Sequence, residues 1–362
     1  MGSGIGGIGD INLAVTGLNA VDTPGPGVAV IRSIKEHPNW KGRIIGLAYD
    51  ALEPGILDAN LINAAYLMPF PKTGRNALLD KIRYIHEQEQ LDVIIPTLDS
   101  EIINFIQIQG ELAAMGIRTF LPTEEQFTKR AKVNLHKLQD EFGIKTPRTY
   151  TISDISEIPK LNEKYPLIVK GILYEAYIAY SIDEAIYYSN KIAQMWGFPI
   201  IIQQYIEGEE FNAACVGSGD VMGMVCMKKM VLTDKGKGWV CVSIINEALM
   251  ALTSRIVKML KWRGALEVEA IYSKSEDEFY LIEINPRFPS WIYLAKASGL
   301  NLPYMLLMAA LNKIEEPCDN NASYPEYAAG IVFSNYTVNL ITDLDKIQTL
   351  FTTGELSYEK SL

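Results

Sequence analysis

The sequence predicts an α/β protein, and three observations carry this prediction. Short apolar runs of strand length alternate with stretches of helical periodicity through residues 11–121, which is the pattern of a doubly wound sheet covered by helices. At 362 residues and 40.4 kDa, the chain is long enough for two or three packed lobes with a substantial core. A hydrophobic content of 48% with 21% charged residues is ordinary for a globular protein.

The first lobe is expected to place ligand-binding loops at one edge of its sheet. Its strands are predicted at 11–16, 44–49, 65–68, 92–97 and 118–121, and its helices at 28–36, 75–90 and 99–115. Ligands of such sheets bind beyond the carboxyl ends of the strands, where residues 17–27 and 97–101 lie. Asn19, Asp22, Asp99 and Glu101 could therefore face a substrate. Helix capping by Asp99 and a turn role for Asp22 explain those two acids equally well.

The rest of the chain is predicted to form a compact αβ unit and then a larger lobe. A helical stretch at 123–142 ends at a Gly-x-x-x-Pro break, residues 143–147. The unit that follows has predicted strands at 165–172, 176–180 and 200–206 and a helix at 182–196. The larger lobe has predicted strands at 209–216, 221–231, 239–245, 266–271 and 279–284 and a helix at 248–261. Residues 290–310 are expected to be rich in helix, and the tail from 328 to mix a strand with a short helix.

Composition and charge exclude several classes of protein. The formal net charge of −10 and a pI near 5.0 argue against non-specific binding to nucleic acid, which requires a basic surface. Four Cys and three His show no zinc-binding spacing. No apolar run reaches the length of a membrane span. Reduced thiols and the absence of a membrane segment predict a cytoplasmic protein.

The glycines near the N-terminus are interpreted as a misleading motif. Gly4, Gly6 and Gly9 have the spacing of a dinucleotide-binding fingerprint. That fingerprint requires a strand before it and a helix after it, whereas here the first predicted strand, 11–16, comes afterwards. Residues 1–10 are therefore expected to be a flexible terminus.

The most informative stretch is residues 278–288, EFYLIEINPRF. Glu283 lies inside an apolar strand, where an acid is rare unless a cation accompanies it. If this strand pairs with 266–271 (LEVEAI), Glu269 comes beside Glu283 and Asn285. Two carboxylates and an amide oxygen suit Mg²⁺, and Arg287 beside them suits phosphate. The alternative is a polar sheet face whose acids Arg287 simply neutralises.

The order of these features resembles the ATP-grasp superfamily. The shared pattern is an α/β domain, a Lys on a helix, a Lys on a strand, a hinge strand followed by Glu, and acid–acid–Asn ending in Asn-Pro-Arg. The resemblance covers residues 11–330 and, through EINPRF, is strongest for the carbamoyl-phosphate-synthase-like or biotin-carboxylase-like group. It implies a Rossmann-like pre-ATP-grasp domain at 11–122 and a two-lobed grasp fold, α+β in its lobes. The small lobe with its leading helices is implied at 123–206, the large lobe at 207–330, and a C-terminal extension packed on the large lobe at 331–362.

The resemblance assigns nucleotide-binding roles residue by residue. Lys132 and Lys170 match the two phosphate-binding lysines, and a Lys inside an apolar strand is costly unless an anion meets it. Glu210 matches the carboxylate that binds the ribose hydroxyls. The hinge that holds the adenine matches Gln203, Gln204, Tyr205 and Ile206. Gln203 stands where the family often has Glu, and its amide can still accept from the adenine amino group.

The resemblance also assigns the metal and the transferred phosphate. Glu269, Glu283 and Asn285 match the ligands of Mg²⁺, with Mn²⁺ as an alternative ion, and Arg287 matches the residue that faces the transferred phosphate. Arg287 and Lys170 are the residues implied to be catalytic.

One departure from the family concerns the loop that covers the triphosphate. The family commonly has a glycine-rich loop after the strand lysine, whereas a single glycine, Gly171, follows Lys170. The basic turn at 235–237, or Lys228 and Lys229 on the preceding strand, is a candidate for the missing phosphate cover. A solvated basic turn is the alternative.

The implied reaction is ATP-dependent activation of a carboxylate as an acyl phosphate, followed by attack of an amine. The implied partners are small-molecule carboxylates and amines rather than nucleic acid or membrane, and a homodimer is compatible with the resemblance. One alternative is a bicarbonate-activating enzyme of the carbamoyl-phosphate-synthase type. Another is a degenerate ATP-binding sensor or scaffold without turnover, which the short loop after Lys170 favours and the intact metal triad opposes.

Overall fold

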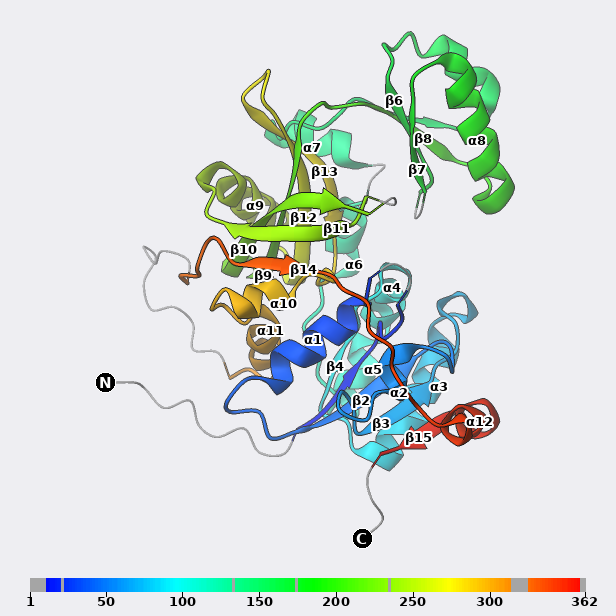
Figure 1. The fold of residues 1–362 in the computed structure, drawn as a ribbon, viewed down its shortest axis with the longest axis vertical. Coiled ribbons are helices and arrows are strands. Elements are labelled where there is room, and N and C mark those ends of the chain that lie inside the picture. Colours follow the sequence, from blue (N-terminus) through cyan, green and yellow to red (C-terminus); the bar gives the residue numbers. More distant parts are fainter. Residues whose placement is uncertain are drawn as a thin grey trace. The chain divides into compact units, whose positions relative to one another are not determined.

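A computed structural model of the protein describes residues 11–20, 23–131, 134–172, 175–233, 236–313 and 325–358 (Figure 1). The chain divides into two compact units. The first contains the chain up to Phe127, Ala213–Glu267 and the chain from Asn285 onward, and the second contains Thr128–Asn212 and Val268–Ile284. The glycines of residues 1–9, Asp22 and Lys132 lie outside the described residues.

The first unit begins with a mainly parallel five-stranded sheet, in the order β15-β3-β2-β1-β4. β1 pairs in parallel with β2 and β4, β2 pairs in parallel with β3, and β15 is antiparallel to β3. Apolar runs buried on both faces, as in Leu13–Val15, are typical of such central strands. The strands are β1 (Asn12–Val15), β2 (Arg43–Ala48), β3 (Ala64–Leu67), β4 (Val93–Ile95) and β15 (Glu355–Ser357). The helical segments between them are α1 (Pro26–Lys35), α2 (Pro54–Leu57), η1 (Pro71–Thr73), α3 (Arg75–Glu89), α4 (Asp99–Gln107) and α5 (Gln109–Ala114).

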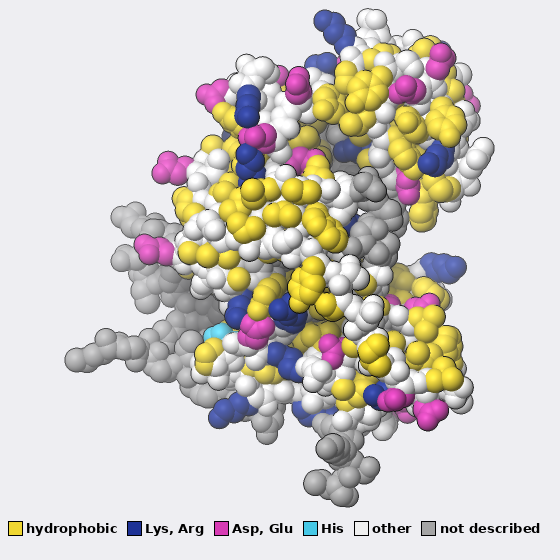
Figure 2. Space-filling view, viewed as in Figure 1, with side chains coloured by type: hydrophobic (Ala, Val, Ile, Leu, Met, Phe, Trp, Pro, Cys, Tyr) yellow, Lys and Arg dark blue, Asp and Glu magenta, His cyan; other side chains and the backbone are white. Residues whose placement is uncertain are grey.

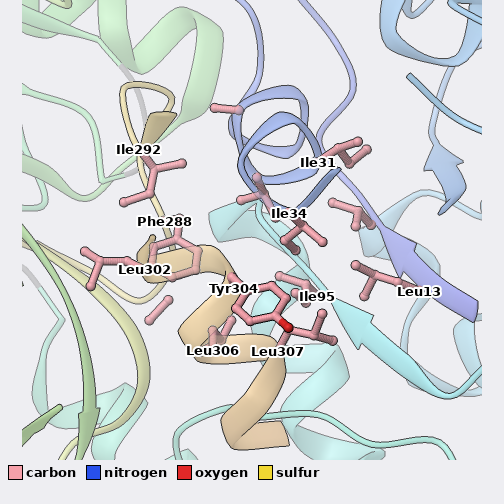
Figure 3. Packing of buried hydrophobic residues seen from close by; sticks show 14 of the residues in the cluster. Leu13, Ile31, Ile34, Ile95, Phe288, Ile292, Leu302, Tyr304, Leu306 and Leu307 are labelled. Carbon is pink, nitrogen blue, oxygen red and sulfur yellow. The ribbon is translucent and has the colours of Figure 1, made fainter. Parts of the chain in front are cut away.

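The core of the first unit joins segments that are far apart in the sequence. Helix α1 packs against α10 (Tyr293–Ala297) and α11 (Leu302–Ala310). Ile31 and Ile34 of α1 and Tyr304 of α11 belong to one buried cluster with Leu13 of β1 (Figure 3). The segment that follows the 278–288 motif is therefore fixed to the N-terminal sheet by hydrophobic packing.

The second unit contains a four-stranded antiparallel sheet, in the order β5-β8-β6-β7. β6 (Leu167–Lys170) and β7 (Ala176–Ala179) form the predicted hairpin, and β8 (Ile200–Gln204) pairs with β6 on the other side. Helix α8 (Ile182–Trp196) covers this sheet. β5 (Thr149–Ile152), η3 (Ile155–Lys160) and α7 (Leu135–Phe142) complete the elements before α8. β5 was not predicted, because its four residues are too few to show periodicity.

A six-stranded sheet has the order β13-β12-β9-β10-β11-β14, and the division between the units runs through its strands β9, β12 and β13. Helix α9 (Glu247–Leu260) packs on β10. Hydrophobic side chains cover much of the face formed by β10 and β11 (Figure 2), and Met230 at the end of β10 is 58% exposed. The strands are β9 (Glu209–Ser218), β10 (Val221–Leu232), β11 (Gly238–Ile244), β12 (Arg263–Ser273), β13 (Glu278–Asn285) and β14 (Val332–Ser334).

The C-terminal tail, predicted to pack on the large lobe, reaches two sheets. β14 extends the six-stranded sheet by pairing with β11, whereas β15 pairs with β3 at the edge of the N-terminal sheet. Helix α12 (Leu344–Thr353) lies between them in the sequence. The tail therefore covers an edge strand, which an open sheet would otherwise expose.

Two predicted elements were wrong in extent. Residues 118–121 form only an isolated bridge between Arg118 and Val93, because the carbonyls of Thr119 and Leu121 accept hydrogen bonds from the Arg263 guanidinium instead of a strand. The helix predicted at 99–115 is interrupted at Ile108.

The helical stretch predicted at 123–142 is two helices, α6 (Glu124–Lys129) and α7 (Leu135–Phe142). The Thr128 carbonyl at the end of α6 accepts from the amide of Ala131 at 3.2 Å and from Nδ2 of Asn134 at 3.0 Å. A side chain thus donates to the last turn of α6, which is typical of a helix end.

Candidate active site

The end of β13 carries a cluster of polar side chains around a buried carboxylate, Glu267 of β12. Glu267 is 3% exposed, and its Oε2 accepts from Nδ2 of Asn285 at 3.0 Å and from Nη1 of Arg287 at 3.3 Å. Its Oε1 accepts from Nε1 of Trp291 at 2.7 Å. All four residues belong to the first unit. Two of the predicted site residues, Asn285 and Arg287, therefore donate to the same carboxylate, that of Glu267.

Asp99 holds the other side of the Arg287 guanidinium. Nε of Arg287 donates to Oδ2 of Asp99 at 2.6 Å, and Nη1 also donates to the Phe288 carbonyl at 3.3 Å. The prediction that Asp99 caps helix α4 was wrong: Leu98 is the N-cap residue, and Asp99 is the first helical residue. A hydrogen bond from a charged guanidinium to a carboxylate is stronger than one from a neutral backbone amide. The Asp99 carboxylate therefore pairs with Arg287 instead of capping the helix.

Glu101 fixes the loop that carries Asp99. It is 1% exposed, and Oε1 accepts from the hydroxyl of Thr16 and from the backbone amides of Thr97 and Leu98 at 3.0 and 2.9 Å. Oε2 accepts from the Tyr49 hydroxyl. Burial raises the pKa of Glu101 and these hydrogen bonds oppose the rise, whereas burial and the Glu101 charge raise the pKa of Tyr49. Glu101 therefore serves the architecture of the loop rather than facing a substrate.

Gly17 allows this loop to pack against the end of β1. It has φ of +73°, and a Cβ on it would lie 2.1 Å from Oγ1 of Thr97. That hydroxyl donates to the carbonyl of Thr16 at 2.9 Å. Only glycine meets both the conformational and the steric requirement here.

A second buried acid, Glu53, lies near the same strand ends. It is 7% exposed, and its Oε1 accepts from the amide of Tyr49 at 2.8 Å. Its Oε2 is buried without a hydrogen-bond partner among the described residues. Burial raises the pKa of Glu53 to about 7, with smaller contributions from the charges of Glu101 and Asp50.

In the second unit, Lys170 and Gln203 are joined on neighbouring strands. Nζ of Lys170 donates to Oε1 of Gln203 at 2.8 Å, and Nε2 of Gln203 donates to Oγ1 of Thr149 at 3.0 Å. Gln203 is 6% exposed, so its amide is fixed in one orientation. Its carbonyl oxygen retains a second lone pair, which another donor can use.

The other predicted site residues lie on the expected elements. Gln204 at the end of β8 and Tyr205 after it are half-buried, and Ile206 is buried. Glu210 on β9, Lys228 on β10, and Glu269 and Glu283 on β12 and β13 are half-buried. Within the described ranges, no three His, Cys, Asp or Glu side chains form a metal-binding group. The predicted magnesium set contains only two carboxylates, so its assignment stays a prediction.

Sequence reasoning missed two residues of this cluster, Glu267 and Trp291. Glu267 alternates with Glu269 in LEVEAI, so the period-two pattern already placed both acids on one face of the strand. The pattern does not reveal that Glu267 is the one beside Arg287. Trp291 gave no sequence signal.

Comparison with known proteins identifies the fold. Residues 130–290 match the model of an ATP-grasp domain. A carbamoyl-phosphate synthase of Methanobrevibacter smithii is 22% identical over 257 residues, which are 65% of this chain and 68% of that protein. The chain spans only 23% and 42% of two further curated relatives.

Among the described residues, no helix is both long enough and apolar enough to cross a membrane.

Two solved structures extend this similarity over most of the chain. The L-amino acid ligase from Bacillus licheniformis has a TM-score of 0.62 at 17% identity, covering 83% of this chain and 74% of that one. The biotin carboxylase domain of the Hydrogenobacter thermophilus 2-oxoglutarate carboxylase has a TM-score of 0.65 at 15% identity, covering 87% and 73%. These similarities show the two-lobed ATP-grasp fold, and the match to the ATP-grasp domain model covers residues 130–290 of the chain.

Proposed function

We propose that the protein is an ATP- and Mg²⁺-dependent ligase that activates a carboxylate as an acyl phosphate and joins it to an amine. The observation that carries this proposal is the cluster at the end of β13, where Arg287 and Asn285 are both held by Glu267. A guanidinium fixed beside an amide oxygen and nearby carboxylates suits a phosphate and its metal. The solved ATP-grasp structures with this fold include an L-amino acid ligase, which supports the reaction class.

The metal ligands proposed are Glu269, Glu283 and Asn285. β12 and β13 are neighbouring strands of one sheet, and the Glu267–Asn285 hydrogen bond links their side chains, which supports a position of Glu269 near Glu283. Glu283 and Asn285 are two residues apart on β13, so both project from the same face of that strand. Carboxylate and amide oxygens are the hard ligands that Mg²⁺ or Mn²⁺ prefers, so the donor set fits the ion.

The nucleotide is proposed to use the residues that the sequence pattern assigns to it. Lys170 would bind phosphate, and the Gln203 oxygen that accepts from Lys170 would also accept from the adenine amino group. The backbone from Gln204 to Ile206 would hold the rest of the adenine, and Glu210 the ribose hydroxyls. Lys132 and Lys228 are the further phosphate-binding residues in this proposal.

The chemistry needs positioning and charge stabilisation rather than a side-chain nucleophile. A carboxylate oxygen of the substrate attacks the γ-phosphorus as the bond to ADP breaks, and the amine then displaces phosphate from the acyl carbon and loses a proton. Arg287 and Lys170 stabilise the charge on the transferred group. Mg²⁺, when bound, supplies neutralisation of the charge shared by the phosphates.

A second candidate is activation of bicarbonate. The similarity to a carbamoyl-phosphate synthase favours it, and the biotin carboxylase domain was solved with bicarbonate as well as MgADP. Both candidates require the same ATP site, so they differ only in which carboxylate and amine are accepted.

A release assay separates these candidates. ADP and phosphate release would be measured with Mg-ATP and mixed amino acids, with bicarbonate and ammonium, and with neither. Release that depends on amino acids supports the ligase, and release that depends on bicarbonate supports the second candidate. Tight Mg-ATP binding with no release in any arm would instead identify a non-catalytic ATP sensor. The Arg287→Ala variant should abolish the release in either enzymatic case.

A further inference from the structure

We infer that Glu267 is a positioning residue that sets the orientation of Asn285 and Arg287 for the metal and the phosphate. The inference rests on the proposed function for what those two side chains do. The orientation itself follows from hydrogen bonds within the first unit.

The hydrogen bonds of Glu267 divide between its two oxygens. Trp291 donates to Oε1 at 2.7 Å, while Asn285 and Arg287 share Oε2 at 3.0 and 3.3 Å. An ionised carboxylate only accepts, so every group that touches it must present a donor. With Glu267 3% exposed and Trp291 7% exposed, this carboxylate has little freedom to turn.

This arrangement fixes which end of the Asn285 amide faces the acid. Its nitrogen points to Glu267, so its carbonyl oxygen is turned away from the acid, which is the orientation a metal ligand requires. Asn285 is 2% exposed, and a buried amide does not rotate without losing its hydrogen bonds. Outer partners of this kind orient the ligands of metal sites and are worth about 10–100-fold in metal affinity.

A purely structural role explains the arrangement less well. Asp99 already pairs with Arg287 at 2.6 Å, so Glu267 is not needed merely to neutralise the guanidinium. A buried acid also costs free energy that an apolar residue of similar size would not. What the Glu267 carboxylate adds is a fixed orientation of the Asn285 and Arg287 side chains.

The Glu267→Gln variant tests this inference, because glutamine has one accepting end and one donating end. If the glutamine nitrogen faces Asn285 and Arg287, it is a donor placed against two other donors. If it faces Trp291, it is a donor placed against the indole N–H. The Asn285 amide would turn to relieve the first conflict and would lose its ligand orientation. Adding Asn285→Asp restores complementarity between residues 267 and 285, since the new carboxylate accepts from the nitrogen of the introduced glutamine with one oxygen and keeps the other for the metal.

The readout is the affinity for Mn²⁺ in the presence of a non-hydrolysable ATP analogue, measured by calorimetry. We expect Glu267→Gln to weaken Mn²⁺ binding about 10–100-fold, and the double variant to recover to within about tenfold of wild type. Binding of the analogue without metal should change much less, because Asp99 still holds Arg287. Trp291→Phe, which removes only the Nε1 donor, should weaken Mn²⁺ binding in the same direction and covers the case in which Glu267→Gln does not fold.

The matched control is Glu89→Gln, another buried acid of the first unit, which accepts from Arg43 at 2.9 Å and from the Tyr66 hydroxyl at 2.7 Å. It should leave Mn²⁺ affinity at the wild-type value. Unchanged Mn²⁺ affinity in folded Glu267→Gln, or a double variant no better than the single one, would overturn the inference and leave the proposed function intact. Failure of the wild type to bind Mn²⁺ with the analogue would count against the proposed function itself.

Discussion

Nε of Arg287 lies 2.6 Å from Oδ2 of Asp99, a residue 188 positions earlier in the chain. The side-chain exposures are 17% and 29%, so the pair lies at the edge of the interior. Asp99 begins helix α4, directly after the loop that buried Glu101 fixes at the carboxyl end of β4. The N-terminal sheet thus contributes an acid that holds the arginine proposed to face the transferred phosphate.

Asp99→Asn should lower the rate of the chemical step without weakening ATP binding. The amide keeps the shape and an acceptor but removes the charge, so the guanidinium is held less firmly. We expect kcat to fall about tenfold, since the lost interaction is a charge-assisted bond worth roughly 1.5 kcal/mol. The measurement is phosphate release at saturating Mg-ATP. Asp80→Asn, at an exposed ion pair with Arg83, is the control and should keep the wild-type rate.

Local patterns in the sequence predicted the elements of the fold well where those patterns are strong. Helix α8 has the predicted bounds, because Ser181 caps it by accepting from the amide of Glu184 and Gly197 ends it. Strands β1 and β8 were visible as apolar runs. β15 was missed because its three residues gain their structure only by pairing with β3.

The sequence predicted which residue types take part in the candidate site, but not which residues contact one another there. Lys170 inside an apolar strand pointed to an anion, yet its contact with Gln203 depends on which strand lies beside β6. The pairing of Arg287 with Asp99 likewise depends on tertiary packing that no local spacing encodes. For the same reason Glu101 looked like a substrate contact in the sequence, whereas in the fold it binds four groups of its own chain.

Lys170→Ala should abolish measurable affinity for Mg-ATP while the protein remains folded. The substitution removes a cation from a strand interior, where its proposed partner is phosphate. Gln203 would lose one hydrogen bond but keep the one to Thr149, so the sheet should persist. Calorimetric titration with Mg-ATP measures the effect, and Lys164→Ala, at an exposed position, is the control. Wild-type affinity in a folded Lys170→Ala protein would rule out the proposed role.

Glu53→Gln should stabilise the protein above neutral pH and leave it unchanged in mild acid. The folded-state pKa of about 7 lies above the ordinary value of 4.5, so the folded protein binds more protons and stability falls as pH rises through this window. Full ionisation of this buried acid costs on the order of 3 kcal/mol, which the neutral amide avoids. Melting temperatures of wild type and variant should therefore agree at pH 4.5 and diverge by several degrees at pH 8. The exposed Glu87→Gln variant should show no such divergence, and a difference that is independent of pH would argue against the ionisation of Glu53 as its cause.

Glu283→Gln should separate nucleotide binding from chemistry. The amide keeps the shape and one oxygen ligand but removes the charge proposed to hold the metal between the phosphates. The nucleotide keeps its proposed contacts at Lys170, the hinge and Glu210, so it should still bind with reduced affinity. Turnover depends on neutralising charge in the transition state, so the larger loss should appear in kcat, with a smaller rise in KM for ATP.

We expect Glu283→Gln to lower the rate at least about a hundredfold, because a charge-stabilising contact in a closed site is typically worth that much. The measurement is phosphate release at saturating ATP with the carboxylate and amine that support wild-type turnover. Glu278→Gln is the matched control: Glu278 begins the same strand and pairs with Lys145, so its charge is used at the surface. If Glu283→Gln turns over at the wild-type rate, Glu283 is a structural acid and the metal must bind elsewhere. If both variants lose activity equally, the effect belongs to the strand rather than to the charge at Glu283.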